Sequence, residues 1–192
     1  IPSSILLNKK SDFHLIVEIH SNEKNNFQKT LKNIFKKNLA EIIKIENNLK
    51  NSWIWKKREE LVHIQKELNY NHKFDISLPL SQWKNFILKI NKFTKKNTQF
   101  TSYFFGHLGD GNLHCNFKVE NELNKDIYFL SEFIYDLTLS LNGSIAAEHG
   151  LGQKKNMLLK KYKSKEYYNF LKNLKNYLDP KKNLGANKLF KS

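Results

Sequence analysis

The chain lacks the features that would tie it together covalently or anchor it in a membrane. Cys115 is the only cysteine among 192 residues, which excludes an internal disulfide framework and permits a reducing compartment. No stretch approaches the roughly 18 apolar residues needed to cross a bilayer, and the N-terminus has no signal-peptide pattern. We therefore expect a soluble protein without a membrane span, in which Cys115 has a packing role.

Motifs for nucleotide binding and for covalent catalysis are also missing. The glycines at positions 106, 109 and 111 have the wrong order for a dinucleotide fingerprint, and they precede an expected strand instead of a helix. There is no Gly-Lys-Ser/Thr phosphate loop, no Gly-x-Ser-x-Gly elbow and no convincing Cys/His nucleophile pair. The sequence therefore predicts neither a self-contained nucleotide-binding fold nor a hydrolase.

Arginine is nearly absent, although the formal net charge is +15. Arg58 is the single Arg among 33 Lys and Arg residues, and the lysines are scattered with asparagines along the whole chain. Proteins that read nucleic acids usually use Arg for bidentate base contacts, and no Arg cluster occurs here. A basic nucleic-acid-binding domain stays an alternative, but we expect no nucleic-acid partner. The charge could instead steer anionic substrates.

The pattern of apolar residues predicts alternating strands and helices. We expect strands at 13–19, 39–45 and 73–78, a hairpin of 100–106 with 112–119, and helices at 21–35, 53–68, 81–96, 125–141, 154–160 and 165–178. The hairpin requires an antiparallel strand pair. The predicted fold class is therefore α+β, with an antiparallel β-sheet flanked by helices.

The hairpin carries two histidines. Asp110-Gly111 is a signal for a two-residue type I′ turn, and pairing across it places His107 opposite His114 on one side of the sheet. Alternation of side chains puts Asn112 and Asn116 on the same side as the histidines. It puts the apolar residues on the other side: Leu108, Leu113, Cys115 and Phe117. One face is thus expected to carry chemistry and the other the core.

A third candidate ligand follows a short apolar run at 144–147. Glu148 and His149 stand there beside Gly150 and Gly152, which permit close backbone approach. Two histidines and a carboxylate leave coordination positions open, as in catalytic metal sites. Spacing alone leaves two interpretations open, because two hydrogen-bonded core histidines are the alternative to a metal site.

Three segments resemble a known family. Residues 106–114, 147–152 and 178–181 resemble the C-terminal domain of FAD-linked oxidases of the vanillyl-alcohol oxidase type. These include D-lactate, glycolate and D-2-hydroxyglutarate dehydrogenases. Segments 55–59 and 73–79 favour the D-2-hydroxyglutarate branch. The resemblance implies that residues 1–192 are a ferredoxin-like C-terminal domain and that the N-terminal FAD-binding domain is absent. The start at Ile1, without an initiator Met, also suggests a fragment.

The resemblance implies the residues of an active site. His107, His114 and Glu148 would bind a divalent metal, which is zinc in the best-known members, and Asn116 and His149 would line the same pocket. His149 would be the general base that removes the proton of the substrate hydroxyl.

Substrate and flavin contacts are implied in the same way. Arg58 and Lys73 match contacts to the substrate carboxylate, where a guanidinium grips bidentately and an ammonium supplies a point charge. Val62 stands where the D-2-hydroxyglutarate branch often has Thr, a difference that could shift substrate choice. Asn187 lies in the segment 184–188, where the family usually reads Leu-Asn-Pro-x-Lys and contacts the flavin.

The implied reaction is the oxidation of a D-2-hydroxy acid to a 2-oxo acid. Hydride would pass to FAD, bound mostly by the missing domain, and electrons would continue to an external acceptor. The compartment would be the cytoplasm, or the mitochondrial matrix in a eukaryote. The alternative is a non-catalytic metal-binding remnant of such an enzyme.

Overall fold

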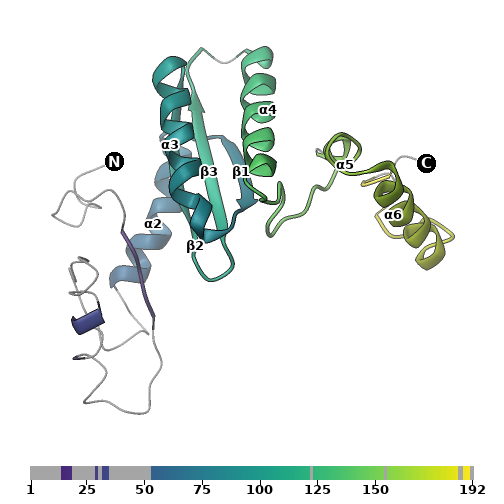
Figure 1. The fold of residues 1–192 in the computed structure, drawn as a ribbon, viewed down its shortest axis with the longest axis horizontal. Helices are drawn as coiled ribbons and strands as arrows, with labels where there is room; N and C mark the ends of the chain where they lie inside the picture. Colours follow the sequence, from purple (N-terminus) through teal and green to yellow (C-terminus); the bar gives the residue numbers. More distant parts are fainter. Residues whose placement is uncertain are drawn as a thin grey trace. The chain divides into compact units, whose positions relative to one another are not determined.

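The computed structural model describes residues 14–18, 29, 32–34, 53–121, 123–153, 155–185 and 188–190 (Figure 1). The chain divides into two compact units, Ile1–Asn69 and Tyr70–Ser192, and each is described by itself. Within the described residues, no helix has both the length and the apolar character to cross a bilayer.

The described part of the first unit is dominated by helix α2 (Trp53–Glu67), which confirms the helix predicted at 53–68. Residues 29 and 32–34 are helical, as predicted, but the other residues of that helix and the predicted strand at 39–45 lie outside the described residues. The prediction of a buried strand at 13–19 is wrong for residues 14–18, which are exposed and in no strand. β-branched residues favour a strand only where pairing and burial support it.

The second unit contains a three-stranded antiparallel sheet. Its strands are β1 (His72–Ser77), β2 (Phe100–His107) and β3 (Asn112–Val119), in the order β1-β3-β2. An isolated bridge pairs Ser77 with Ser144 on the free side of β1. The bridge occupies the place of the fourth strand of a ferredoxin-like βαββαβ sheet. The structure thus confirms the predicted α+β class.

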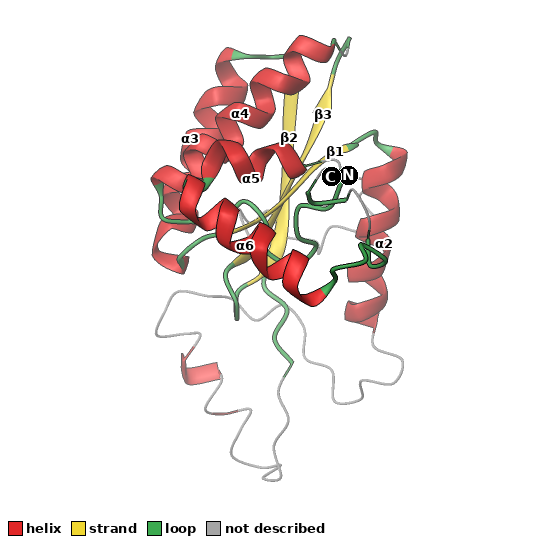
Figure 2. Cartoon of the chain, turned by 90° about the vertical axis from the view of Figure 1, so that its right-hand side faces the viewer, coloured by secondary structure: helices red, strands yellow, loops and turns green. Residues whose placement is uncertain are grey.

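Helices α3 (Leu80–Lys96) and α4 (Asn124–Ser140) cover one face of this sheet. Figure 2 shows both helices on the same side of the strands. Phe93 of α3 stacks on Phe100 of β2 and on Phe133 of α4, with ring centroids 5.5 and 4.0 Å apart. The strands contribute alternate apolar residues to the same core: Phe74, Ile76, Leu113, Cys115 and Phe117. The opposite face of the sheet carries the alternate side chains of the strands, which do not belong to this core.

Two further helices follow, α5 (Asn156–Tyr162) and α6 (Lys165–Leu178). Leu159 of α5 is buried, and Tyr162 meets Tyr135 of α4 edge-on, with ring centroids 6.1 Å apart. Ser164 caps α6 because its side chain accepts a hydrogen bond from the Tyr167 backbone N–H. Both helices confirm the predicted elements.

The hairpin differs from its prediction in register. His107 pairs with Asn112 instead of His114, and residues 108–111 form a four-residue loop. Asp110 accepts the Asn112 backbone N–H through its side chain, and the Gly111 carbonyl accepts the Leu78 N–H at 3.0 Å. These hydrogen bonds stabilise the longer loop, which also leaves Leu108 exposed and not on the core side as expected. The register moves by two residues, so His107 and His114 still share a face.

Cys115 provides a test of the core. Its side chain is completely buried, and burial raises the pKa of its thiol well above the ordinary value. Because the thiolate is the reactive form, we expect the folded protein not to react with a thiol reagent such as DTNB, and the urea-unfolded protein to react fully. Rapid labelling under native conditions would contradict this packing.

The hairpin loop gives a second test. Gly111 has φ +72°, and a Cβ there would lie 2.4 Å from the Leu78 carbonyl oxygen. We expect Gly111→Ala to lower the free energy of unfolding by about 1–3 kcal/mol from backbone strain, with more from the clash. Urea unfolding measures this change. The matched control is Gly109→Ala, whose Cβ would meet no atom within 4 Å; equal losses in both variants would refute the argument.

Candidate metal centre

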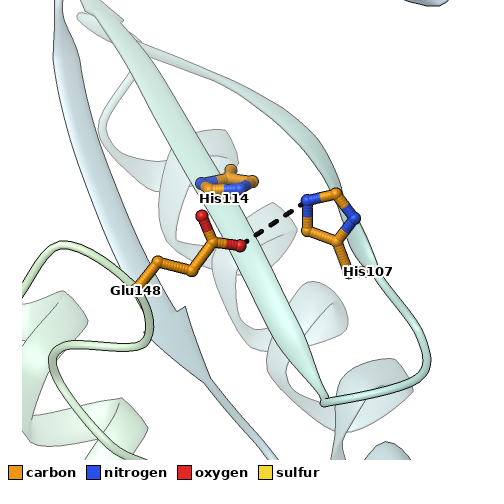
Figure 3. A group of neighbouring side chains, drawn as sticks. All are labelled: His107, His114 and Glu148. Carbon is orange, nitrogen blue, oxygen red and sulfur yellow. Dashed lines mark ion pairs between the residues drawn. The ribbon is translucent and has the colours of Figure 1, made fainter.

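The three predicted metal ligands meet on the sheet face opposite the core. His107 ends β2, His114 lies in the middle of β3, and Glu148 lies in the loop after the Ser77–Ser144 bridge (Figure 3). One candidate ligand atom from each residue lies within 4.8 Å of the others. Among the described residues, the structure thus brings together all three members of the predicted set.

The donor set fits a divalent metal. His107 Nε2 is 3.6 Å from Glu148 Oε1, and the two imidazole rings are nearly perpendicular, with centroids 5.8 Å apart. Donors of a tetrahedral zinc ion lie about 3.4 Å from one another, since each bond is about 2.1 Å long. Small side-chain rotations would therefore close the set, and two histidines with one carboxylate leave a position free for a substrate.

His114 is the most enclosed of the three predicted ligands. Its side chain is 15% exposed, and its ring stacks on Phe105 with centroids 4.6 Å apart. Burial lowers the pKa of His114, although the carboxylates of Asp75 and Glu148 oppose that shift. A lowered pKa favours the neutral imidazole, which is the form that binds a metal.

Two residues that the sequence analysis did not assign to the site support the ligands. Asn112 is 1% exposed and donates through Nδ2 to Glu148 Oε1, which orients that carboxylate. Asp75 is the Cα partner of His114 across the β1–β3 ladder. Alternation along β3 had already placed Asn112 on the face of His114, and alternation along β1 places Asp75 on the polar face as well, but not its contact with the Glu148 loop.

Asp75 contacts two parts of the site at once. Its Oδ2 accepts hydrogen bonds from the backbone N–H groups of Glu148 and His149, at 2.9 and 3.1 Å, and its Oδ1 is 3.6 Å from His114 Nδ1. Burial by itself raises the pKa of the Asp75 carboxyl, but the two backbone N–H groups and the nearby histidines together hold it below the ordinary value. Asp75 therefore stays ionised in this structure.

The other predicted residues of the second unit lie close by in the fold. His149 follows Glu148, with its Nε2 3.9 Å from Glu148 Oε2, and its side chain is 75% exposed. Asn116 of β3 is buried and lies two residues after His114, so both side chains are on the same face. Lys73 is the Cα partner of Asn116 on β1. The sheet thus aligns Lys73 and Asn116 beside the group of His107, His114 and Glu148.

The remaining predicted contacts stay predictions. Arg58 and Val62 lie four residues apart on α2, hence on one side of that helix, but they belong to the first unit. Asn187 lies outside the described residues.

Three relatives illustrate what the sequence is similar to. The mitochondrial D-2-hydroxyglutarate dehydrogenase of Rattus norvegicus is 28% identical over 179 residues, covering 90% of this chain and 33% of that protein. A D-2-hydroxyglutarate dehydrogenase of Stutzerimonas stutzeri is 30% identical over 153 residues, covering 76% and 32%. A putative mitochondrial D-lactate dehydrogenase of Schizosaccharomyces pombe is 34% identical over 137 residues, covering 66% and 26%.

These relatives are much longer than the present sequence, which spans about a third or less of their length. The family described as "FAD linked oxidases, C-terminal domain" matches residues 3–189. Because this match covers nearly the whole sequence, and because the sheet and helices agree with it, the chain belongs to the family of FAD-linked oxidase C-terminal domains.

Proposed function

We propose that this chain is the metal- and substrate-binding part of a flavin-dependent dehydrogenase that oxidises a D-2-hydroxy acid to the 2-oxo acid. The observation that carries the proposal is the convergence of His107, His114 and Glu148 on one face of the sheet. The names of the relatives supply the substrate class, because they are D-2-hydroxyglutarate and D-lactate dehydrogenases. Such substrates are small anions, which suits a chain with a formal net charge of +15.

The metal we propose for this centre is a divalent cation, with zinc as the first candidate. Two imidazoles and one carboxylate are common ligands of catalytic zinc. A cation held there would supply a Lewis acid that lowers the pKa of a coordinated hydroxyl group. The Asn112 amide would keep the Glu148 carboxylate turned toward the cation.

His149 is proposed to take the proton of the substrate hydroxyl. Its backbone N–H is held by Asp75, so the position of the residue is fixed, while its side chain is exposed to an incoming substrate. An imidazole is the natural base near neutral pH. Glu148 next to it would stabilise the imidazolium that forms, because the two side chains are 3.9 Å apart.

The substrate carboxylates are proposed to bind to cationic and amide side chains. Lys73 and Asn116 face each other across β1 and β3, where they could contact the carboxylate next to the reacting carbon. Arg58 would grip a carboxylate with two parallel hydrogen bonds. Val62, one turn further along α2, offers no hydrogen bond, which would reduce discrimination for a polar substrate group.

FAD binding is assigned to a separate FAD-binding domain. The family description implies FAD. Neither strand-to-helix connection of the sheet, 78–79 or 120–123, contains a glycine, whereas a dinucleotide fingerprint requires glycines at that turn. The described residues therefore offer no such phosphate cradle. In the proposed enzyme, that other domain would hold the flavin that accepts hydride from the substrate, and the reduced flavin would pass its electrons to an external acceptor.

Metal binding is tested directly on this chain. We expect about one zinc ion per chain. His107→Ala and Glu148→Ala should each weaken zinc binding by more than the roughly 10- to 100-fold that loss of a supporting residue costs. Competition with a chromogenic chelator measures the affinity, and elemental analysis the stoichiometry. His63→Ala, which removes an exposed histidine on α2, is the control. Unchanged zinc binding in both ligand variants would refute the site.

Substrate binding is tested in the full-length protein with its FAD domain. We expect Arg58→Lys to raise KM for D-2-hydroxyglutarate about 10-fold or more, because a charge-assisted bidentate pair contributes about 1.5–3 kcal/mol. Lys56→Ala, which removes a neighbouring exposed cation on α2, should leave KM nearly unchanged. An unaltered KM in Arg58→Lys would exclude the carboxylate contact. Zinc binding without any turnover would favour a non-catalytic metal-binding protein.

A further inference from the structure

We propose that Asp75 is the positioning residue of the metal centre, because its two carboxylate oxygens connect the ligand His114 to the loop that carries Glu148. This inference rests on the proposed metal site, since it assigns a role to a residue that would not touch the metal. Three observations support it: the hydrogen bonds of one oxygen, the buried and unpaired state of the other, and the register of β1 against β3.

The first oxygen holds the loop. Asp75 Oδ2 accepts the backbone N–H groups of two consecutive residues, Glu148 and His149. The Asp75 carbonyl also accepts the Ala147 N–H, at 3.2 Å. Asp75 thereby fixes three successive peptide groups beside β1. The backbone of Glu148 is held at this point, so Asp75 restricts the positions that the Glu148 carboxylate can adopt.

The second oxygen faces His114. Asp75 Oδ1 is buried and has no hydrogen-bond donor among the described residues. A buried acceptor without a donor is costly, and the nearest candidate is His114 Nδ1 at 3.6 Å, slightly beyond hydrogen-bond length. A small rotation of the imidazole would complete this bond. The Nδ1 atom would then carry the proton, and Nε2 would be free to bind a metal.

The pairing of the strands keeps the two side chains together. Asp75 and His114 are Cα partners in the β1–β3 ladder, so their side chains leave the same face of the sheet at adjacent points. A metal-bound histidine usually donates its second ring N–H to a carboxylate, which fixes the tautomer and the ring orientation. The sheet here presents a carboxylate at that place.

A purely structural clamp is the competing interpretation, in which Asp75 only anchors the loop through Oδ2. The two interpretations differ in the tautomer of His114. A clamp leaves the imidazole free to adopt either neutral tautomer, whereas a positioning residue favours the form protonated at Nδ1. The tautomer is therefore the observable that separates them.

The first measurement is zinc affinity of the whole chain, by competition with a chromogenic chelator. We expect Asp75→Asn to weaken zinc binding about 10- to 100-fold, because only one atom of the amide accepts hydrogen bonds. If that oxygen accepts the loop N–H groups, the NH2 group faces His114 and cannot accept a hydrogen bond from its Nδ1–H. Asp126→Asn, which makes the same charge change in the first turn of α4, should bind zinc like the unaltered protein. Urea unfolding curves show whether both variants are folded.

The second measurement can be made on the unaltered protein alone. Nitrogen-15 NMR of the metal-free protein at about pH 8, where an ordinary imidazole is neutral, reports which nitrogen of His114 carries the proton. We expect Nδ1–H in the unaltered protein and a shift toward Nε2–H in Asp75→Asn. This spectrum tests the inference even if Asp75→Asn does not fold.

The outcomes separate this inference from the proposed function. If the unaltered chain binds zinc and Asp75→Asn binds it equally tightly, or if His114 is protonated at Nε2 in the unaltered protein, the role of Asp75 is wrong and the metal centre stands. If the unaltered chain binds no zinc, the metal centre is refuted, and the role of Asp75 with it.

Discussion

The antiparallel pairing of β1 with β3 is the interaction on which the site depends. It sets Asp75 against His114 and Lys73 against Asn116. The same strand β1 continues through Ser77 into the bridge with Ser144, which brings the Glu148 loop alongside the sheet. A shift of β1 by one residue would turn its own side chains Lys73 and Asp75 toward the core, away from Asn116 and His114. The apolar residues Phe74 and Ile76, which alternate with the polar ones, oppose such a shift because both are buried.

The site also depends on the difference between the two faces of the sheet, one apolar and packed, the other polar. Helices α3 and α4 cover the face that carries Phe74, Cys115 and Phe117, and this packing provides most of the buried apolar surface of the second unit. The other face is therefore free to carry polar and ionisable residues that would be costly inside the core. Ligands on strands packed against a rigid layer are held more precisely than ligands on loops.

Much of this arrangement could be predicted from residue patterns. Alternation assigned the two faces of β3 correctly, although not the position of Leu108. The three residues predicted as metal ligands, His107, His114 and Glu148, do lie together in the fold. The hairpin register could not be predicted, because the longer loop is held in part by a hydrogen bond from the backbone N–H of Leu78, which is distant in sequence, to the Gly111 carbonyl. The strand predicted at the exposed segment 14–18 is wrong for the same reason, since its composition favours a strand but only long-range pairing makes one. Asp75 was overlooked because its role depends on a partner 73 residues away.

The three predicted ligands come from segments that meet only when the hairpin and the bridge at Ser144 have formed. In the unfolded chain, Glu148 is far along the sequence from His107 and His114, so a cation has no comparable site there. Any cation held by this set must therefore favour the folded state by mass action, to a degree that grows with its free concentration. The stability of this domain would then depend on the metal supply of its surroundings as well as on its sequence.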